Sequence, residues 1–365
     1  MNPKIMGEAS GPASRRCWWF ANSGIRRLLW TIALLCGRSA HASNVLEKGG
    51  STSIFAPASP PAHLIAGLAH FVLLVAGGIF AVVAGLIIYA AIRFRHRPGD
   101  DDSWEPAQVY GSESVELAWT IVPVVIVTIL ALTTARVIQE IQNPSRPANA
   151  LDVQVIGHQF WWEIRYPKYG IVTANELHVP VGELSDRQPT FLDLRSADVV
   201  HSFWVPRLAG KTDLVPGHPN VMWIEPEKAG LYLGQCAEYC GTQHSLMLIR
   251  VYADSPKDFV RWVEEQKAGL AESSNVAAGR HVFESYACIN CHNVAGTAGS
   301  GHFGPDLTHL MSRATLGAGA VPNTYSNLRA WIKDPGQFKP GVLMPAMNLG
   351  EGEIDSLVAY LSTLK

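Results

Sequence analysis

The sequence has little charge and no excess of either sign. Charged residues make up 16% of its 365 residues, and the formal net charge is -2. A protein that binds nucleic acid needs a concentration of basic residues, so this balance excludes a nucleic-acid partner. Hydrophobic residues make up 48% of the chain, which indicates a protein that is partly embedded in a membrane. The sequence has no internal repeat, and its length suits two or three compact units rather than one.

Cysteine is also scarce, with six residues in the chain. Four arginines between positions 15 and 27 precede an apolar stretch, Leu28 to Leu35, and then Ala40-His41-Ala42. This order is typical of a secretory signal peptide, which we predict over residues 1–42; a short interfacial anchor helix is the alternative. Cleavage after Ala42 leaves four cysteines. Each of them lies in a ligand-like motif, so no pair remains for a structural disulfide.

Two long apolar runs follow the signal. Leu64 to Ile92 and Leu117 to Ile138 are each long enough to cross a bilayer, which predicts a transmembrane helix hairpin over residues 63–140. Arg93 and Arg95 directly follow the first run, and this places the loop between the two helices on the cytoplasmic side. Everything after about residue 140 is therefore predicted to be outside the cytoplasm.

The rest of the chain changes pattern twice. Residues 148–255 contain short alternating stretches separated by Pro and Gly, which favours an antiparallel β-sandwich or barrel. Residues 256–275 begin as an amphipathic helix and end in a polar linker. Residues 276–365 are rich in Gly and have helical segments, so we predict a third unit with a terminal helix.

One loop of the β region concentrates soft metal ligands. Cys236, Cys240, His244 and Met247 lie within one short segment, at spacings that allow them to converge. Sulfur and imidazole ligands suit copper or zinc, and a thioether favours copper. The alternatives are a Cys236–Cys240 disulfide, a structural zinc site completed by His201, and a mononuclear copper site. A mononuclear copper site needs only one thiolate, whereas two thiolates would serve two copper ions.

The third unit carries a second chemical motif. Cys288-Ile289-Asn290-Cys291-His292 is a c-type haem attachment sequence, with two thioether positions and a proximal imidazole. Met344, which precedes a proline in a loop before the terminal helix, is the predicted distal ligand, and Met347 is the rival.

The motifs together resemble a known family. The run from Asp198 to Pro206, the run from Lys211 to Gly217 and the Cys236 loop resemble subunit II of the haem-copper cytochrome c oxidases, and the attached haem motif resembles the caa3 type with a fused cytochrome c. The resemblance implies a dinuclear copper A centre. Its ligands would be the side chains of His201, Cys236, Cys240, His244 and Met247 and the carbonyl of Glu238.

Three further roles come from the resemblance. The Glu238 carboxylate would bind Mg²⁺ at the contact with subunit I, and Glu116 would open a proton-uptake path. Glu116 is equally explained as a carboxylate that favours a helix N-terminus. Phe160 stands where the family usually has the tryptophan that receives electrons, so Trp161 or Trp162 would take over this role or would be core aromatics.

We therefore predict a multi-domain membrane protein with a two-helix transmembrane hairpin, an all-β cupredoxin-like Greek-key sandwich and an all-α class I cytochrome c domain. The expected function is that of subunit II of a proton-translocating cytochrome c oxidase, which passes electrons from haem c to copper A and on to subunit I, where O2 is reduced to water. A nitric oxide reductase subunit and a membrane-tethered copper-delivery module are the alternatives. The expected partners are subunit I, subunit III, a soluble or membrane-bound electron donor and the lipid bilayer. The expected location is the bacterial inner (plasma) membrane.

Overall fold

The computed structural model describes residues 52–96, 108, 110–182, 188–268 and 276–365. The predicted signal peptide, residues 1–42, lies outside the described residues.

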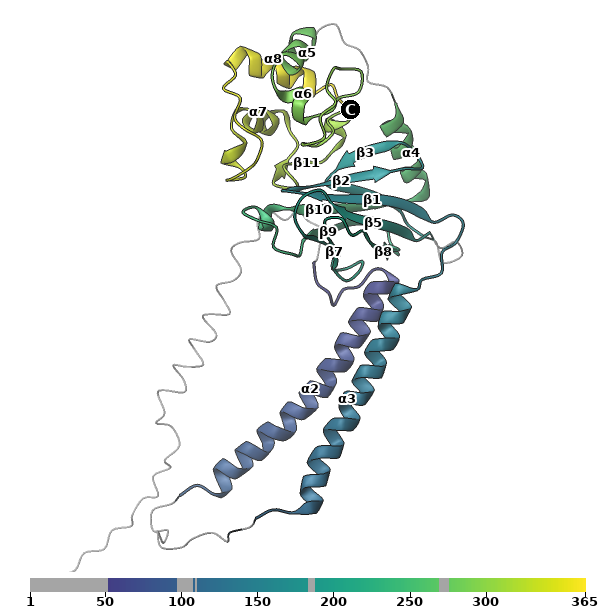
Figure 1. Ribbon diagram of the computed structural model, residues 1–365, viewed down its shortest axis with the longest axis vertical. Coiled ribbons are helices and arrows are strands. Elements are labelled where there is room, and N and C mark those ends of the chain that lie inside the picture. The colour runs from purple at the N-terminus through teal and green to yellow at the C-terminus, as the bar shows by residue number, and fades with distance from the viewer. Residues whose placement is uncertain (1–51, 97–107, 109, 183–187, 269–275) are drawn as a thin grey trace, which may run out of the picture. The chain divides into compact units, whose positions relative to one another are not determined.

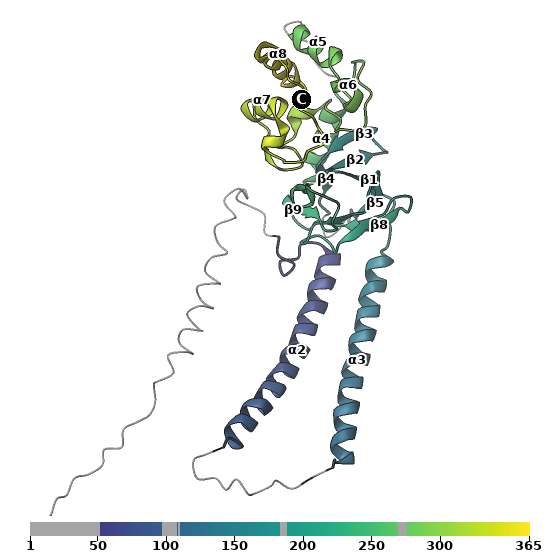
Figure 2. The same cartoon turned by 60° about the vertical axis from the view of Figure 1, so that its left-hand side comes forward.

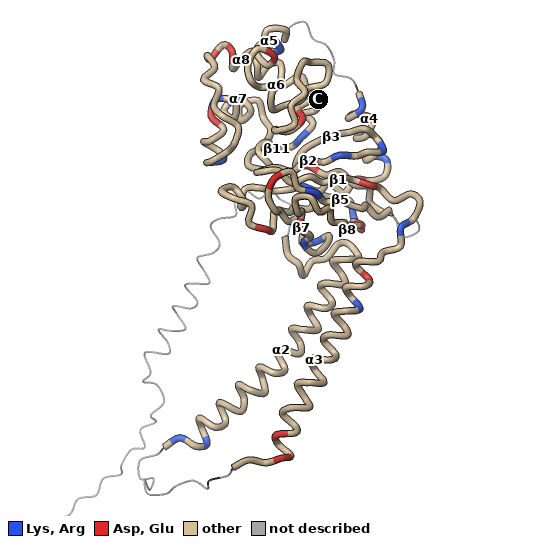
Figure 3. The backbone as a smooth tube through the Cα atoms, viewed as in Figure 1, with Lys and Arg blue, Asp and Glu red and all other residues tan. Residues whose placement is uncertain are grey.

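Two long helices follow the N-terminal segment. Helix α2 spans Pro60–Arg93 and helix α3 spans Glu113–Gln142, and they lie side by side in both ribbon views (Figures 1 and 2). Each helix is longer than the apolar run that predicted it, at both its N-terminal and its C-terminal end. Their charged residues lie near the helix ends, and the long middle parts carry none (Figure 3). Apolar side chains such as Leu74 and Phe80 are largely exposed along these middle parts, as expected for helices that face lipid.

The middle of the chain forms two five-stranded sheets that pack face to face, as the alternating pattern predicted. The first has the order β3-β2-β1-β5-β8 and the second the order β4-β10-β9-β6-β7. Strand β1 shows the alternation directly, with Leu151, Val153 and Val155 buried and the residues between them more exposed. The first sheet contains β1 (Leu151–His158), β2 (Trp161–Tyr166), β3 (Ile171–Ala174), β5 (Thr190–Ser196) and β8 (Asn220–Ile224). The second contains β4 (Glu176–Pro180), β6 (His201–Trp204), β7 (Thr212–Leu214), β9 (Gly230–Cys236) and β10 (Leu248–Asp254).

Most neighbouring strands are antiparallel, but two pairs are parallel. Strand β1 pairs in parallel with β5, and β10 pairs in parallel with β4. A parallel pair requires a crossover between the sheets, so the chain passes from one layer to the other more than once. This mixed sandwich is the cupredoxin-like architecture. It brings β6 beside β9, and the loop between β9 and β10 lies at the end of both strands.

The C-terminal unit has its own core. After α4 (Pro256–Lys267), whose Phe259 and Val263 pack on the sandwich, the chain forms α5 (Ala277–Ser285), α6 (Cys288–Cys291), α7 (Tyr325–Lys333) and α8 (Glu351–Leu361). Short 3-10 turns η3 (Leu310–Ser312) and η4 (Pro335–Gln337) join these elements, whereas η1 (His244–Leu246) lies in the loop between β9 and β10 of the sandwich. The predicted terminal helix is α8, and its apolar residues Leu357, Val358 and Leu361 are all buried. Helices α5 and α8 pack together around Gly279, where an added Cβ would approach the Ser356 carbonyl to 2.0 Å.

One element was not predicted. Strands β11 (Thr315–Leu316) and β12 (Val321–Pro322) form a small hairpin in the otherwise helical unit. Its turn contains Gly317, Ala318 and Gly319, all with positive φ. Two-residue strands carry too little alternation to be read from a sequence.

Candidate metal centre and haem pocket

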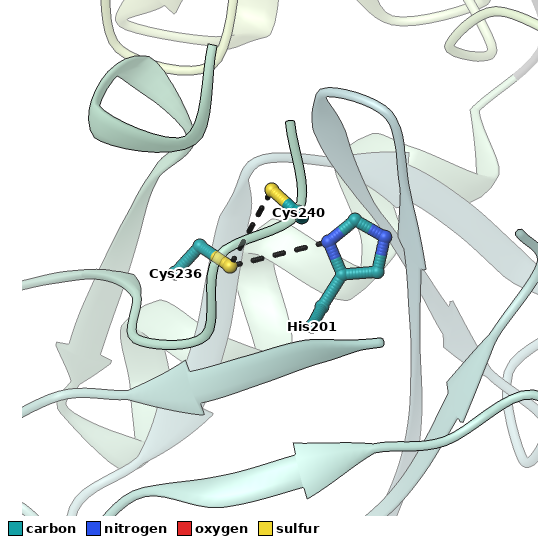
Figure 4. Close-up of side chains that lie close together, drawn as sticks. All are labelled: His201, Cys236 and Cys240. Atoms are coloured by element: carbon teal, nitrogen blue, oxygen red, sulfur yellow. Dashed lines mark hydrogen bonds between the residues drawn. The ribbon is translucent and has the colours of Figure 1, made fainter. Parts of the chain in front are cut away.

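Three soft ligands meet at the end of the sandwich. The Sγ atom of Cys236 lies 3.8 Å from Cys240 Sγ and 3.9 Å from His201 Nδ1. Figure 4 shows these three side chains pointing toward one another, and all of them are buried. Among the described residues, they form a group whose ligand atoms all lie within 4.8 Å of one another. The two sulfurs are not bonded to each other, which leaves both thiols free to bind metal.

Three further ligand atoms complete the cluster. Cys240 Sγ lies 3.8 Å from His244 Nδ1 and 3.9 Å from Met247 Sδ, and the Glu238 carbonyl lies 3.2 Å from Cys236 Sγ. The structure therefore brings together all six residues that the resemblance named for this site. Met247 is fully buried, in a position where its thioether faces the cysteines.

Strands and one close contact hold these residues in place. His201 begins β6 and Cys236 ends β9, and these strands are paired through Phe203 and Cys236. The His201 ring lies against Gly157 of β1, where a Cβ would approach His201 Cδ2 to 2.7 Å. A larger residue at position 157 would displace the imidazole, so glycine is required there by close approach.

A carboxylate fixes the orientation of His201. Asp198 Oδ1 lies 2.8 Å from His201 Nε2, which turns Nδ1 toward Cys236. Burial alone would lower the pKa of His201, but the hydrogen bonds with Asp198 and Cys236 raise it above its usual value. The Asp198 carboxylate also accepts hydrogen bonds from the backbone N–H groups of Gln159 and Val199. Asp198 is the first residue of a motif identified in the sequence, but the sequence predicted no role for it.

The two thiols titrate as a pair. The Sγ atoms of Cys236 and Cys240 are in hydrogen-bonding contact at 3.8 Å, and this contact lowers the pKa of Cys236 and raises that of Cys240. Both thiols would lose their protons on binding metal, because the thiolate is the form that ligates. Two thiolates, two imidazoles, a thioether and a carbonyl form a donor set that suits two copper ions better than one zinc ion, because zinc in proteins takes four ligands. The residues present therefore fit a dinuclear copper centre.

The haem motif lies at one wall of a large apolar pocket. Cys288, Cys291 and His292 all line it. His292 Nδ1 lies 2.7 Å from the Pro305 carbonyl, which leaves Nε2 free to bind iron. Burial lowers the pKa of His292, so the imidazole is neutral and available as a ligand at neutral pH.

Two details of the pocket fit a haem. Gly304 lies against His292, and a Cβ there would approach the ring to 2.5 Å, so the position has room only for glycine. Arg313 is buried in the pocket wall, and its Nε has no hydrogen-bond partner among the described residues. Arg313 Nη2 donates to the Asp306 carbonyl, but a buried N–H group without an acceptor is costly, and a haem carboxylate would be a suitable partner for Nε. Met344 and Met347 both line the same pocket and both are partly buried. Both therefore remain candidates for the distal ligand of the haem iron.

The aromatic stretch lies between the two sites. Trp161 is 8% exposed, stacks on His158 with ring centroids 4.3 Å apart, and lines the haem pocket together with Phe160. Trp162 is fully buried, with its ring centroid 6.1 Å from that of His201. The two tryptophans are thus on opposite sides of β2, as alternation in a strand requires.

Hydrogen bonds join the C-terminal unit to the sandwich. The Glu176 carboxylate, 3% exposed on β4, accepts hydrogen bonds from Ala314 N, Thr315 N and Thr315 Oγ1 at 2.9 to 3.0 Å. The Leu248 N–H donates to the Ala318 carbonyl at 3.2 Å. These contacts involve the unpredicted hairpin, and a sequence alone gives no signal that would pair such distant positions.

A second set of contacts involves the metal-binding loop itself. The Gln243 side chain donates to the carbonyls of Lys339 and Pro340 at 3.0 and 3.1 Å. Lys339 Nζ donates to the Phe160 carbonyl at 3.1 Å. Burial lowers the pKa of Lys339 to about 8. Neither Gln243 nor Lys339 was identified from the sequence.

Two predicted carboxylates lie outside these clusters. Glu116 is exposed in the first turn of α3, near the end that follows the loop between the helices. The Glu238 carboxylate is partly exposed and lies 3.7 Å from Lys211 Nζ.

Comparisons with known proteins agree with the geometry. Three family models match: "Cytochrome C oxidase subunit II, transmembrane domain" over residues 51–137, "Cytochrome C oxidase subunit II, periplasmic domain" over residues 151–253 and "Cytochrome c" over residues 276–365. The chain is 36% identical to cytochrome c oxidase subunit 2 of Alkalihalophilus pseudofirmus over 316 residues, covering 85% of this chain and 90% of that protein.

Two other relatives cover less of the chain. Cytochrome c oxidase subunit 2 of Bacillus subtilis is 32% identical over 301 residues, covering 77% of this chain and 82% of that protein. The solved periplasmic domain of subunit II of cytochrome oxidase of Bradyrhizobium japonicum is 30% identical, with a TM-score of 0.31, and covers 33% of this chain and 96% of that chain. The copper and haem motifs, the two membrane helices and the extent of these matches lead to one conclusion: the chain belongs to the cytochrome c oxidase subunit II family and carries a fused cytochrome c domain.

Proposed function

We propose that this chain receives electrons for a haem-copper oxidase through its own cytochrome domain and delivers them to subunit I, with O2 reduced to water and protons pumped there. The observation that carries the proposal is the shared pocket. Its wall contains Cys288 and His292 from the cytochrome domain and Phe160, Trp161 and Gln243 from the copper domain. The haem and the dinuclear copper centre would each supply one-electron redox chemistry when bound, and residues of both domains line the haem pocket.

The test is the activity of the whole complex. Membranes are solubilised, the complex is purified through this chain, and co-purifying chains are identified. We expect subunit I among them, together with oxygen uptake on addition of a reduced cytochrome c and no turnover of nitric oxide. Nitric oxide turnover without oxygen uptake would assign the chain to a reductase instead.

The proposed copper ligands come from the start of β6, the end of β9 and the loop after β9. We propose His201, Cys236, Cys240, His244, Met247 and the Glu238 carbonyl as this set. All six ligand atoms lie within contact distance of a neighbouring ligand, and the cysteines and His201 are buried away from water. A rigid, dry site limits rearrangement when an electron arrives or leaves.

Asp198 would act on copper through His201. Asp198→Ala removes the group that orients the imidazole, so we expect copper affinity to fall by about 10- to 100-fold, with the same spectrum at saturating copper. Affinity is measured by competition of the apo complex with a copper chelator. Asp152→Ala, which changes an exposed carboxylate on β1, is the matched control and leaves affinity unchanged. Equal affinities for the two variants would remove Asp198 from this role.

The haem would be held by the Cys288 and Cys291 thioethers, His292 and Met344. Trp161 and Trp162 are proposed as the electron path toward copper, since the first lines the haem pocket and the second lies beside His201. Trp161 and Trp162 are consecutive residues, so the main chain connects the haem pocket covalently to the neighbourhood of His201.

Glu176 would keep the two domains docked. Glu176→Ala leaves the N–H groups of Ala314 and Thr315 and the Thr315 hydroxyl without their acceptor, at a cost of about 1–3 kcal/mol for each buried group. We expect the rate of electron transfer from haem to copper to fall at least about tenfold as the undocked population grows. The rate is measured after flash reduction of the haem.

The control for docking is Glu264→Ala, which removes an exposed carboxylate from α4. Both variants should keep their copper and haem absorption spectra. An unchanged rate in Glu176→Ala would mean that this contact does not govern the distance between the two sites.

Further roles are proposed for the membrane face. Glu116 would take up protons at the cytoplasmic start of α3, and the Glu238 carboxylate would bind Mg²⁺ where the copper domain meets subunit I. We place the chain in the bacterial plasma membrane, with both cofactor domains outside the cytoplasm. Subunit III and a cytochrome or membrane-bound electron donor are the proposed further partners.

A further inference from the structure

Lys339 is a buried cation in the contact between the two domains. Its side chain belongs to the cytochrome domain and is 2% exposed. Its Nζ donates one hydrogen bond, to the Phe160 carbonyl of the copper domain. Among the residues that the structure describes, no carboxylate lies within ion-pair distance of it. A buried ammonium group with one neutral acceptor is unfavourable for folding, so stability alone does not explain a lysine here.

The position of Lys339 relates it to both cofactor sites. Its side chain lines the haem pocket, five residues before Met344 in the chain. Its carbonyl accepts a hydrogen bond from Gln243, the residue next to the copper ligand His244. Phe160, whose carbonyl it contacts, lies against Gly241, the residue next to the copper ligand Cys240. The ammonium group therefore lies in a low-dielectric region between the haem and the copper ligands.

We propose that Lys339 tunes the electron transfer from haem to copper, by raising the reduction potential of the copper centre with its positive charge. Reduction adds one negative charge to the site, and a nearby cation in a dry environment stabilises the reduced form more than the oxidised form. The methylene stem fills space in the interface, but the charge at its end is what affects the potential. This inference rests on the proposed function, since it assumes that copper is bound at the site.

The experiment is a spectroelectrochemical titration of the purified holo complex at pH 7, in which the near-infrared copper band is followed. Lys339→Met keeps the stem and removes the charge. We expect the midpoint potential of the copper centre to fall by ~59 mV, which corresponds to a tenfold change in the one-electron equilibrium. Lys339→Arg keeps the charge and should retain the original midpoint.

Two further variants make the result decisive. Lys333→Met removes an exposed lysine from α7 and should leave the copper midpoint unchanged. Lys339→Gln serves as a second neutral variant if Lys339→Met does not assemble, and it should show the same fall. An unchanged midpoint in the neutral variants, with slower electron transfer, would overturn the proposal and leave Lys339 as a docking residue only.

The readout is independent of oxygen reduction. A complex that turned over nitric oxide rather than oxygen would contradict the proposed function, yet the copper midpoint would still respond to Lys339. A complex that reduced oxygen normally with no change in midpoint would contradict the role of Lys339 alone.

Discussion

Cys236→Ser is expected to abolish the near-infrared absorption of the copper centre while the haem spectrum remains. The Cys236 sulfur lies 3.8 Å from Cys240 Sγ, 3.9 Å from His201 Nδ1 and 3.2 Å from the Glu238 carbonyl, so it is the ligand with neighbours on three sides. A serine hydroxyl is a hard ligand with a high pKa, and it does not replace a bridging thiolate. The haem domain folds around a separate core, so its spectrum should be unaffected.

The loss should extend to activity. Oxygen uptake with a reduced cytochrome c as donor should fall to near the background rate, because the proposed electron path from the haem to subunit I passes through the copper centre. Ser245→Ala, which changes an exposed residue of the same loop, is the control and should keep both spectra. A copper spectrum that survives Cys236→Ser would contradict the ligand assignment.

Met344→Ala is expected to lower the reduction potential of the haem sharply. A thioether axial ligand favours the reduced haem, and axial ligation sets haem potentials over a range of about 0.8 V, so we expect a fall on the order of 100 mV or more. The measurement is a redox titration of the haem absorption bands in the whole complex.

Met347→Ala is the matched comparison, because both methionines line the same pocket and are similarly buried. We expect it to leave the haem potential close to that of the unchanged protein. A sharp fall in Met347→Ala, with little change in Met344→Ala, would reverse the axial assignment.

Local patterns were sufficient to predict much of this architecture. The apolar runs of the two membrane helices, the alternation in β1 and the buried stripe of α8 each follow from the periodicity of one segment. The copper loop was predicted for a similar reason, because Cys236, Cys240, His244 and Met247 lie within twelve consecutive residues. His201 is distant in sequence; it was considered as the last ligand of a zinc site, and it was assigned to the copper site through the resemblance.

The contact between the domains could not be predicted. Glu176 and Thr315 are 139 positions apart, and Phe160 and Lys339 are 179 apart, so nothing local relates them. A buried glutamate or lysine also looks like a surface residue in a sequence, since both types are usually exposed. Only the fold reveals that these two charges are enclosed, and the inferences on docking and on copper potential follow from that.

The central claim is that electrons reach copper through the haem of the same chain. The most direct test is rapid reduction of the whole complex by an external reduced cytochrome c, with the haem and copper bands followed together. We predict that the haem is reduced first and that copper reduction follows at the rate of haem reoxidation. We also predict that a variant with Cys288→Ala and Cys291→Ala, which cannot attach haem, loses this copper reduction. Copper that is reduced before the haem, or equally fast without it, would contradict the account.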